Sequence, residues 1–410
     1  MSESDDAAEL QHFDRVIAAF RTHGQYQRMN AERVQDHWSR VPEAMRRAAP
    51  KDALSSRLNG LRAAADLNHE FLEEAAALAW HCRPVSERDA VPLPPSGQSA
   101  EAGGVGKRPR TQRDLSPEAL HDLSRVSSTL HSVAREWTAE GAGERAQSLG
   151  VIVDELVAWL PLKARNERRV LVPGVGTGRL LLEVCAAGYR AQGNEFSYHM
   201  LFAAGLMLNG ADGAEVFRVC PFVDQPSNAR KASDVWRSMG VPDVDPRAHL
   251  DGWRARHAAT AVGSADDDPP ADMSLAAGDF LVVYSGPEHQ GAWDAVVTCF
   301  FLDTAPVIMD YVAHIASLLP VGGYWINLGP LLYHWAAATE AGEKADSRYE
   351  QSIELSWEEV RHVLVAFGFD IVKEEWKNDV RYTCNTMSMM RTHYDCVLFV
   401  ARKTPKANPS

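Results

Sequence analysis

Apolar residues recur at three- and four-residue spacing along the start of the chain, as in Val16, Ile17 and Phe20. This spacing places them on one face of a helix, so residues 1–82 are predicted to form a helical N-terminal region. Residues 83–114 break the pattern, because they are rich in Pro, Gly, Ser and charge and contain almost nothing that could bury a core. We therefore expect a flexible linker or loop there.

The helical pattern resumes directly after this linker. Ser116 and Pro117 have the residue types preferred at a helix N-cap and at the first helical position. Apolar residues at helical spacing follow as far as Trp137, and a second helix is predicted at about residues 145–160. Residues 115–165 are thus expected to be leading helices of the domain that follows.

From about residue 166 to 404, short β-branched runs alternate with segments of helix length. This alternation is typical of a parallel sheet, so the fold class is α/β and Rossmann-like. Strands are predicted at 169–173, 189–195, 280–284, 293–299, 323–328, 369–375 and 395–402. An insertion of about residues 211–275 precedes the third strand, and residues 261–272 within it are predicted to be a low-complexity loop. Ser356 with Glu359 predicts a capping box for the helix that Gly368 ends.

A glycine loop follows the first of these strands. Gly174, Gly176 and Gly178 form a G-x-G-x-G pattern where the strand turns into a helix. Glycine allows the backbone to turn sharply or to approach a ligand, although a purely structural turn is the alternative. Glu195 ends the next strand, 195 − 174 = 21 residues after the first glycine. A carboxylate there can accept hydrogen bonds from both ribose hydroxyls of a nucleoside, and S-adenosylmethionine has such a nucleoside without phosphates.

Further candidate residues follow the later strands. Asp279 and Phe280 are expected at the start of the third strand, where an acid and an apolar side chain would hold the edge and face of adenine. Cys299 would line the pocket through its backbone, and Asp303 lies just past the fourth strand, where its carboxylate could reach substrate. For each of these residues a structural role in a turn or in the core is the alternative.

Composition excludes several functional classes. The net charge of −13 disfavours nucleic acids and acidic membranes as partners. No stretch approaches the length of a membrane span, and the polar N-terminus does not resemble a signal peptide. Six cysteines without a C-x-x-C pair predict reduced thiols and no metal site. We expect the protein in the cytoplasm, with the nucleus as a second compartment.

Several sequence blocks closely resemble carnosine N-methyltransferases, over roughly residues 115–403. They are VLVPGVGTGRL (170–180), GYRAQGNEFSYHMLF (188–202), AGDF (277–280), TCFFLDTA (298–305), INLGPLLYHW (326–335), SIELSWEE (352–359) and SMMRTHYDCVLFVARK (388–403). The resemblance implies a class I methyltransferase fold. It also implies transfer of a methyl group from S-adenosylmethionine, without a metal, to an imidazole nitrogen of carnosine, giving anserine.

The resemblance also implies roles for individual residues. Cofactor contacts are implied at Arg135, Gly174, Glu195, Asp279, Phe280 and Cys299, with Gly176 in the same loop. The family has Gln three residues before the arginine, whereas this chain has Ser132. Catalytic and substrate-binding positions are implied at Asp303, His334 and Tyr394. Near Tyr394 the family tends to have a run of tyrosines, which Thr392 and His393 interrupt here.

Other functions stay open at this point. A peptide or protein histidine methyltransferase would use the same imidazole pocket, and a catalytically silent scaffold would keep the fold alone. A dinucleotide oxidoreductase is disfavoured, because its loop has the spacing G-x-G-x-x-G. The expected partner is a small histidine-containing dipeptide or peptide, and the N-terminal helices leave a homodimer open.

Overall fold

The computed structural model describes residues 3–82, 114–161, 168–258, 272–336 and 351–405, and these form two compact units. The helical unit comprises Met1–Gly141, Tyr198–Pro246 and Thr383–Arg391. The sheet unit comprises Ala142–Ser197, Arg247–Tyr382 and Thr392–Ser410. The predicted linker and low-complexity loop lie outside the described residues, apart from the last residue of each.

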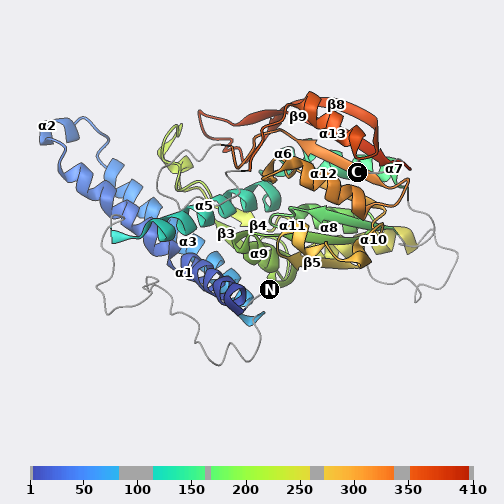
Figure 1. The fold of residues 1–410 in the computed structure, drawn as a ribbon. Coiled ribbons are helices and arrows are strands. Elements are labelled where there is room, and N and C mark those ends of the chain that lie inside the picture. Colours follow the sequence, from blue (N-terminus) through green and yellow to red (C-terminus); the bar gives the residue numbers. More distant parts are fainter. Residues whose placement is uncertain (1–2, 83–113, 162–167, 259–271, 337–350, 406–410) are drawn as a thin grey trace. The chain divides into compact units, whose positions relative to one another are not determined.

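Three long helices build most of the helical unit. Helices α1 (Glu3–Ser39) and α3 (Ala53–His81) pack side by side as a hairpin, with the short α2 (Glu43–Arg46) at its tip (Figure 1). Helix α5 (Pro117–Trp137) packs against α1. Its start confirms the predicted cap, because the Ser116 hydroxyl accepts a hydrogen bond from the backbone N–H of Ala119 at 3.2 Å.

The middle of the chain completes the helical unit. It supplies α9 (Tyr198–Gly205), a π-helical turn (Leu206–Gly210) and an antiparallel pair, β3 (Phe217–Val219) and β4 (Met239–Val241). This pair was not predicted from the sequence. One core cluster joins the hairpin to this region through Ala31, Leu58, Leu61, Ala64, Cys220, Val223 and Val235.

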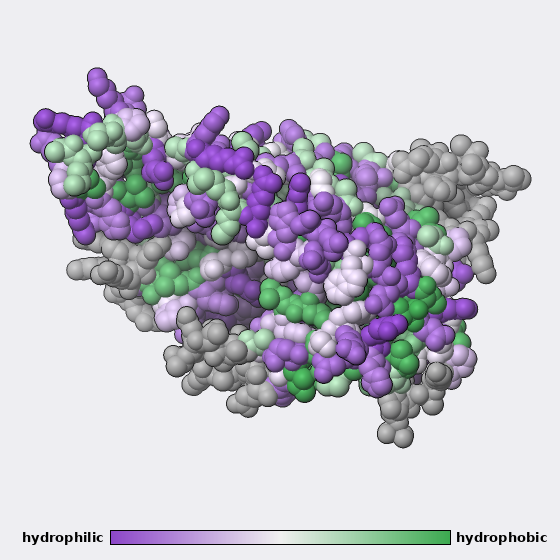
Figure 2. Space-filling model, turned by 90° about the horizontal axis from the view of Figure 1, so that it is seen from above, coloured by the Kyte–Doolittle hydropathy of each residue, from purple (hydrophilic) through white to green (hydrophobic). Residues whose placement is uncertain are grey.

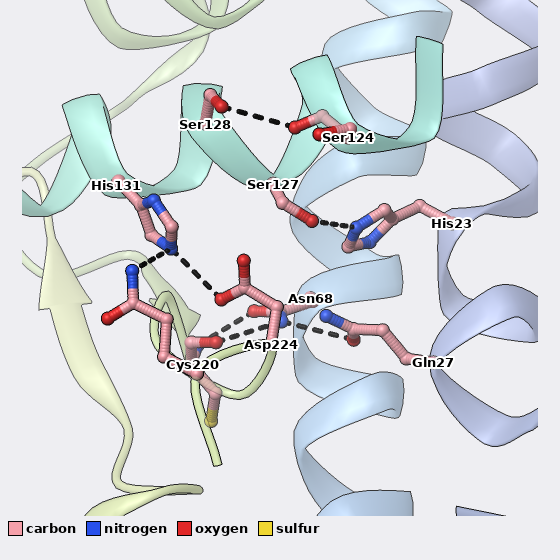
Figure 3. Close-up of polar contacts among 10 residues, drawn as sticks. His23, Gln27, Asn68, Ser124, Ser127, Ser128, His131, Cys220 and Asp224 are labelled. Atoms are coloured by element: carbon pink, nitrogen blue, oxygen red, sulfur yellow. Dashed lines mark hydrogen bonds and ion pairs between the residues drawn. The ribbon is translucent and has the colours of Figure 1, made fainter. Parts of the chain in front are cut away.

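A polar network accompanies this core (Figure 3). The Asn68 side chain on α3 donates to Gln27 on α1, and it exchanges hydrogen bonds with the backbone carbonyl and N–H of Cys220. The imidazole of His23 lies 3.0 Å from the Ser127 hydroxyl on α5. A buried polar group is costly unless it is paired, so these bonds fix how the three helices pack.

The tip of the hairpin carries mainly hydrophilic side chains (Figure 2). Ion pairs at i, i+4 spacing join Arg40 to Asp36 and Arg47 to Glu43 there. Such exposed pairs contribute only about 0.3–0.5 kcal/mol each. The hairpin is therefore stabilised mainly by its buried apolar face.

The sheet unit contains one seven-stranded sheet of order β5-β2-β1-β6-β7-β9-β8. Its strands are β1 (Arg169–Pro173), β2 (Arg190–Glu195), β5 (Met273–Ala277), β6 (Ala295–Cys299), β7 (Tyr324–Gly329), β8 (Phe369–Arg381) and β9 (His393–Lys403). The first five are parallel, and β9 runs antiparallel between β7 and β8. The order reverses at β1, so the carboxyl ends of β1, β2 and β6 meet at a topological switch point, the usual ligand site of such sheets.

Helices and alternating strand residues form the core of this unit. The helices are α6 (Ala142–Gln147), α7 (Leu149–Trp159), α8 (Arg179–Ala186), α10 (Pro246–Ala258), α11 (Phe280–Val283), α12 (Ile308–Leu318) and α13 (Trp357–Ala366). One cluster joins α12 and α13 to every second residue of the central strands, including Leu171, Val296, Trp325 and Phe399. Their neighbours along each strand face the other side, as β-strand geometry requires.

The structure corrects one predicted strand. Residues 280–284 are not a strand, because Phe280–Val283 form the short helix α11 and the third strand of the sheet, β5, ends before them at Ala277. Asp279 causes this change, since its side chain accepts hydrogen bonds from the N–H groups of Leu281 and Val282 as a helix N-cap. The other six predicted strands and the capping box at Ser356 are confirmed.

Within the ranges given above, no helix has both the length and the apolar character needed to cross a membrane.

Candidate functional site

The glycine loop begins where β1 ends. Gly174, Gly176 and Gly178 all have positive φ, of 65°, 59° and 96°, which side chains other than glycine rarely adopt. A Cβ on Gly174 would lie 2.3 Å from a ring carbon of Phe301. Gly178 is the N-cap residue of α8. The conformation of this loop therefore depends on glycine, and at Gly174 it brings the backbone close to the Phe301 ring.

Glu195 lies at the end of β2 and faces this loop. One carboxylate oxygen accepts a hydrogen bond from the Gly176 N–H at 2.9 Å. The other oxygen accepts from the N–H groups of Phe196 and Ser197, also at 2.9 Å. Three backbone N–H groups therefore hold the Glu195 carboxylate in a fixed orientation beside the glycine loop.

Asp279 and Phe280 form the turn after β5. The Gly278 N–H donates to the Glu195 carbonyl at 2.9 Å, so this turn adjoins the end of β2. The Phe280 residue is only 3% exposed, and its ring packs among other aromatic rings. The expected stacking of this ring on a base therefore does not fit, and a ligand contact at Phe280 would come from its backbone.

The exit of β6 holds a buried carboxyl group with a shifted pKa. Cys299 is partly buried at the strand end. Four residues later, Asp303 is only 3% exposed, and this burial raises the pKa of its carboxyl to about 6. Phe300 between them has φ 54°, a conformation that is rare for a bulky residue and that clusters at functional sites.

A strap of residues 331–336, which follows β7, is bound to this exit. The Leu332 N–H donates to a carboxylate oxygen of Asp303 at 2.8 Å, and the His334 N–H donates to the Asp303 carbonyl at 3.1 Å. The Trp335 indole N–H donates to the Thr304 carbonyl at 2.9 Å. The two predicted residues Asp303 and His334 thus lie together, joined by this backbone hydrogen bond. The side chain of His334 is exposed.

Three aromatic rings adjoin the same exit. Phe300 lies 4.7 Å from Tyr382 and 6.1 Å from Tyr394, measured between ring centroids, and the two tyrosines are 5.9 Å apart. Burial raises the pKa of the Tyr394 hydroxyl, and the nearby charge of Asp303 contributes to this shift. Sequence reasoning identified Tyr394 but missed Phe300 and Tyr382. The signal for Phe300 was its place in TCFFLDTA, three residues before Asp303.

Ser132 and Arg135 stand apart from these residues in the chain. Both lie on α5 of the helical unit, where Ser132 is buried and Arg135 forms an ion pair with its neighbour Glu136. Their expected cofactor contacts stay predictions. Among the described residues no group of three His, Cys, Asp or Glu side chains could hold a metal ion.

Residues 112–405 match the family model described as Carnosine N-methyltransferase. The chain belongs to the carnosine N-methyltransferase family. The mouse carnosine N-methyltransferase is 33% identical over 404 residues, which cover 98% of this chain and 88% of that protein. The fission yeast enzyme, from Schizosaccharomyces pombe, is 36% identical over 293 residues, covering 71% of this chain and 74% of the other. "Carnosine N-methyltransferase unmet" of Drosophila melanogaster is 35% identical over 283 residues, covering 68% and 56%.

Family membership agrees with the architecture. The strand order, with the seventh sheet strand along the chain inserted antiparallel beside the fifth, is typical of class I methyltransferases. The matched residues include α5 and the sheet unit as far as residue 405, so the predicted resemblance is confirmed. The match to the mouse protein also extends across the N-terminal helices.

Proposed function

We propose that this protein transfers a methyl group from S-adenosylmethionine to an imidazole nitrogen of carnosine, giving anserine. Family membership supports the reaction class. The observation that carries the proposal is the buried Asp303 carboxyl, held at the exit of β6 next to the His334 strap and the aromatic rings of Phe300, Tyr382 and Tyr394. This combination suits a flat, nitrogen-containing ring that becomes positively charged.

The residues around the switch point fit S-adenosylmethionine. The glycine loop 174–178, whose positive φ angles side chains rarely adopt, would lie against the amino acid part of the cofactor. Glu195, which ends β2 beside this loop, would accept a hydrogen bond from the ribose. The Asp279 turn and the backbone of Cys299 would supply further contacts from the sheet unit. When bound, the cofactor supplies a methyl group on a positively charged sulfur, which is a strong electrophile.

Asp303 is the catalytic residue in this proposal. Its carboxylate accepts the N–H of one imidazole nitrogen, so the lone pair of the other nitrogen faces the methyl group. With a pKa of about 6, the carboxyl is largely ionised at neutral pH, and its charge stabilises the imidazolium that forms. Aromatic faces next to the ring add cation–π attraction of about 0.5–2 kcal/mol.

His334 and Tyr394 bind the rest of the dipeptide. Both carry polar groups near Asp303, and the imidazole and the phenol can pair with its carboxylate, amide or amine groups. No strong general base is required, because the methylated ring can lose its proton to water afterwards. Holding the two reactants in line supplies most of the acceleration.

The test is to incubate the purified protein with S-adenosylmethionine and carnosine and to analyse the dipeptide by mass spectrometry. We expect a product that is heavier by one methyl group, with fragments that place the group on imidazole. A dipeptide with alanine in place of histidine is the matched control and should stay unmodified. Asp303→Asn should still bind S-adenosylmethionine but lose turnover by about a hundredfold or more.

An unmodified carnosine, with S-adenosylmethionine bound, would contradict the substrate but leave methyl transfer standing. Histidine-containing peptides would then be tested as acceptors in the same assay. Unchanged turnover in Asp303→Asn would contradict the role given to that carboxylate.

A further inference from the structure

Gly329 ends β7 directly beside the point where β6 ends. The two strands pair in parallel as far as Cys299 and Leu328. The Phe300 N–H then donates to the Leu328 carbonyl at 2.9 Å, which continues the pairing by one bond. In this register Phe300 would come opposite Gly329 as the next strand pair, but Phe300 has a φ of 54° and the strand ends before it.

The conformation of Phe300 has to be enforced by its surroundings. A positive φ is strained for a bulky residue, and it persists only where neighbouring groups fix it. The ring of Phe300 packs against those of Tyr382 and Tyr394, at 4.7 and 6.1 Å between centroids. The backbone of Phe300 therefore determines the place of a ring that the proposed function assigns to the imidazole site.

Gly329 has no side chain at the place where the backbone of Phe300 lies. Among the described residues, the atoms nearest to a Cβ on Gly329 would be the Cα and N of Phe300, each at 3.3 Å. This distance is tighter than most Cβ contacts, so Phe300 would have to move by a few tenths of an ångström. Gly329 is not among the glycines with positive φ. The close approach to Phe300, and not its own conformation, thus accounts for glycine at this position.

We propose that Gly329 is a positioning residue for the methyl acceptor. Its bare backbone lets Phe300 keep the left-handed conformation in which the ring packs against Tyr382 and Tyr394. The inference rests on the proposed function, because it takes the Phe300 ring as one wall of the imidazole site.

Gly329→Ala tests this role, and Gly323→Ala is the matched control. Gly323 lies just before β7, at the other end of the same strand, and it also lacks a positive φ. A Cβ there would be equally crowded by backbone, at 3.1 Å from the carbonyl oxygen of Pro320 and 3.3 Å from that of Asp294. The measurements are kcat and the KM for carnosine at saturating cofactor, the affinity for S-adenosylmethionine by calorimetry, and the unfolding temperature.

We expect Gly329→Ala to raise the KM for carnosine by about three- to tenfold, because a misplacement of about 1 Å can cost a hundredfold. Affinity for S-adenosylmethionine should not change, since Cys299 is held by its pairing with Leu328. Gly323→Ala should lower the unfolding temperature to a similar extent but leave kcat and KM unchanged.

A double-mutant cycle shows whether Gly329 acts through the Phe300 ring. Phe300→Leu keeps a Cβ at the strained position and removes the ring. In this background Gly329→Ala should lower the unfolding temperature as it does in the wild type, while the KM for carnosine hardly rises further. If Gly329→Ala does not fold, Phe300→Gly and Phe300→Ala are compared instead. The glycine variant should unfold at the higher temperature, because glycine adopts a positive φ without strain.

An unchanged KM in Gly329→Ala would overturn the positioning role, and so would an equal rise in Gly323→Ala. Independent, additive effects of Gly329→Ala and Phe300→Leu on KM would also overturn it, as would equal stability of Phe300→Gly and Phe300→Ala. Failure of the wild-type protein to methylate carnosine is a different outcome, which would contradict the proposed function itself.

Discussion

At the scale of single residues, Asp303 couples the proposed chemistry to stability. Its pKa of about 6 in the folded protein lies above the usual 3.8, because burial disfavours the ionised form. Between these two values the folded state binds more protons than the unfolded state, so stability falls as pH rises through this window. The difference between these two pKa values corresponds to roughly 3 kcal/mol, which the folded protein loses by ionising Asp303.

Substitution of Asp303 by Asn should therefore stabilise the protein where the carboxyl is ionised. We expect the unfolding free energy of Asp303→Asn to exceed that of the wild type by roughly 2–3 kcal/mol at pH 8, and the difference to vanish near pH 4. The Asn side chain can still accept the Leu332 N–H, so the strap stays bound. Urea unfolding at both pH values measures this, and a variant that is less stable at pH 8 would contradict it.

At the scale of elements, the strap of residues 331–336 determines where His334 lies. The Tyr333 hydroxyl donates to the Leu355 carbonyl at 2.6 Å and anchors the strap to the segment just before α13. Removing that hydroxyl in Tyr333→Phe costs about 0.5–1.5 kcal/mol of strap stability. We expect the KM for carnosine to rise several-fold, while the affinity for S-adenosylmethionine stays unchanged.

Tyr324→Phe provides the control for this experiment. Tyr324 begins β7, at the end of the strand opposite to the strap, so its substitution should leave both constants unchanged. Tyr333→Phe could instead lower the affinities for S-adenosylmethionine and carnosine equally. That result would contradict the expectation that the strap affects carnosine binding alone.

Sequence patterns predicted most elements of the sheet unit but misread its third strand. β5 consists of Met273–Ala277, in which small and partly exposed residues give weak strand signals. The β-branched run after it, including Val282 and Val283, has strand-like composition but is helical. A single cap at Asp279 decides this, and a side-chain cap depends on atomic geometry that composition does not reveal.

The candidate site could be predicted as far as its residues follow strand ends. Glu195 and Asp303 were found in this way, because parallel strands bring their carboxyl ends to one edge. Tyr382 was not found, because it approaches Phe300 only through the pairing of the long strands β8 and β9, whose register shifts twice. Pairings between distant segments leave no local periodic signal.

At the scale of the whole molecule, the N-terminal helices are part of a unit and not a separate appendage. The helical unit combines residues from the start, the middle and the last quarter of the chain. Leu58 and Leu61 of α3 share a core with Cys220 and Val235 of the middle segment. The segment after β8 joins it too, since the Met389 N–H donates to the Asn228 carbonyl at 2.8 Å.

Buried histidines of the helical unit and Asp303 of the sheet unit respond to acid in opposite directions. In the helical unit, burial lowers the pKa of His23 to about 4 and that of His199 to about 3, below the usual 6.5. The unfolded chain therefore binds these protons first, and stability is lost as pH falls from about 6.5 through the lower values. In the sheet unit, the raised pKa of Asp303 has the reverse effect. The folded state binds this proton first, so stability increases as pH falls from about 6 towards 3.8.

We expect acid to loosen the helical unit before the sheet unit. His23 lies in the network between α1, α3 and α5 (Figure 3), and the lowering of its pKa from 6.5 to about 4 corresponds to roughly 3 kcal/mol.

Hydrogen exchange measures this order of loosening. Corrected for intrinsic rates, exchange should accelerate in α1 and α5 between pH 6.5 and 4, and in β1 and β6 only at lower pH. His23→Gln keeps a partner for Ser127 without titrating, so its α1 should loosen at lower pH, whereas His121→Gln, at an exposed position, should behave as wild type. Simultaneous loosening of both units, unaltered in His23→Gln, would show that the buried histidines do not control acid stability.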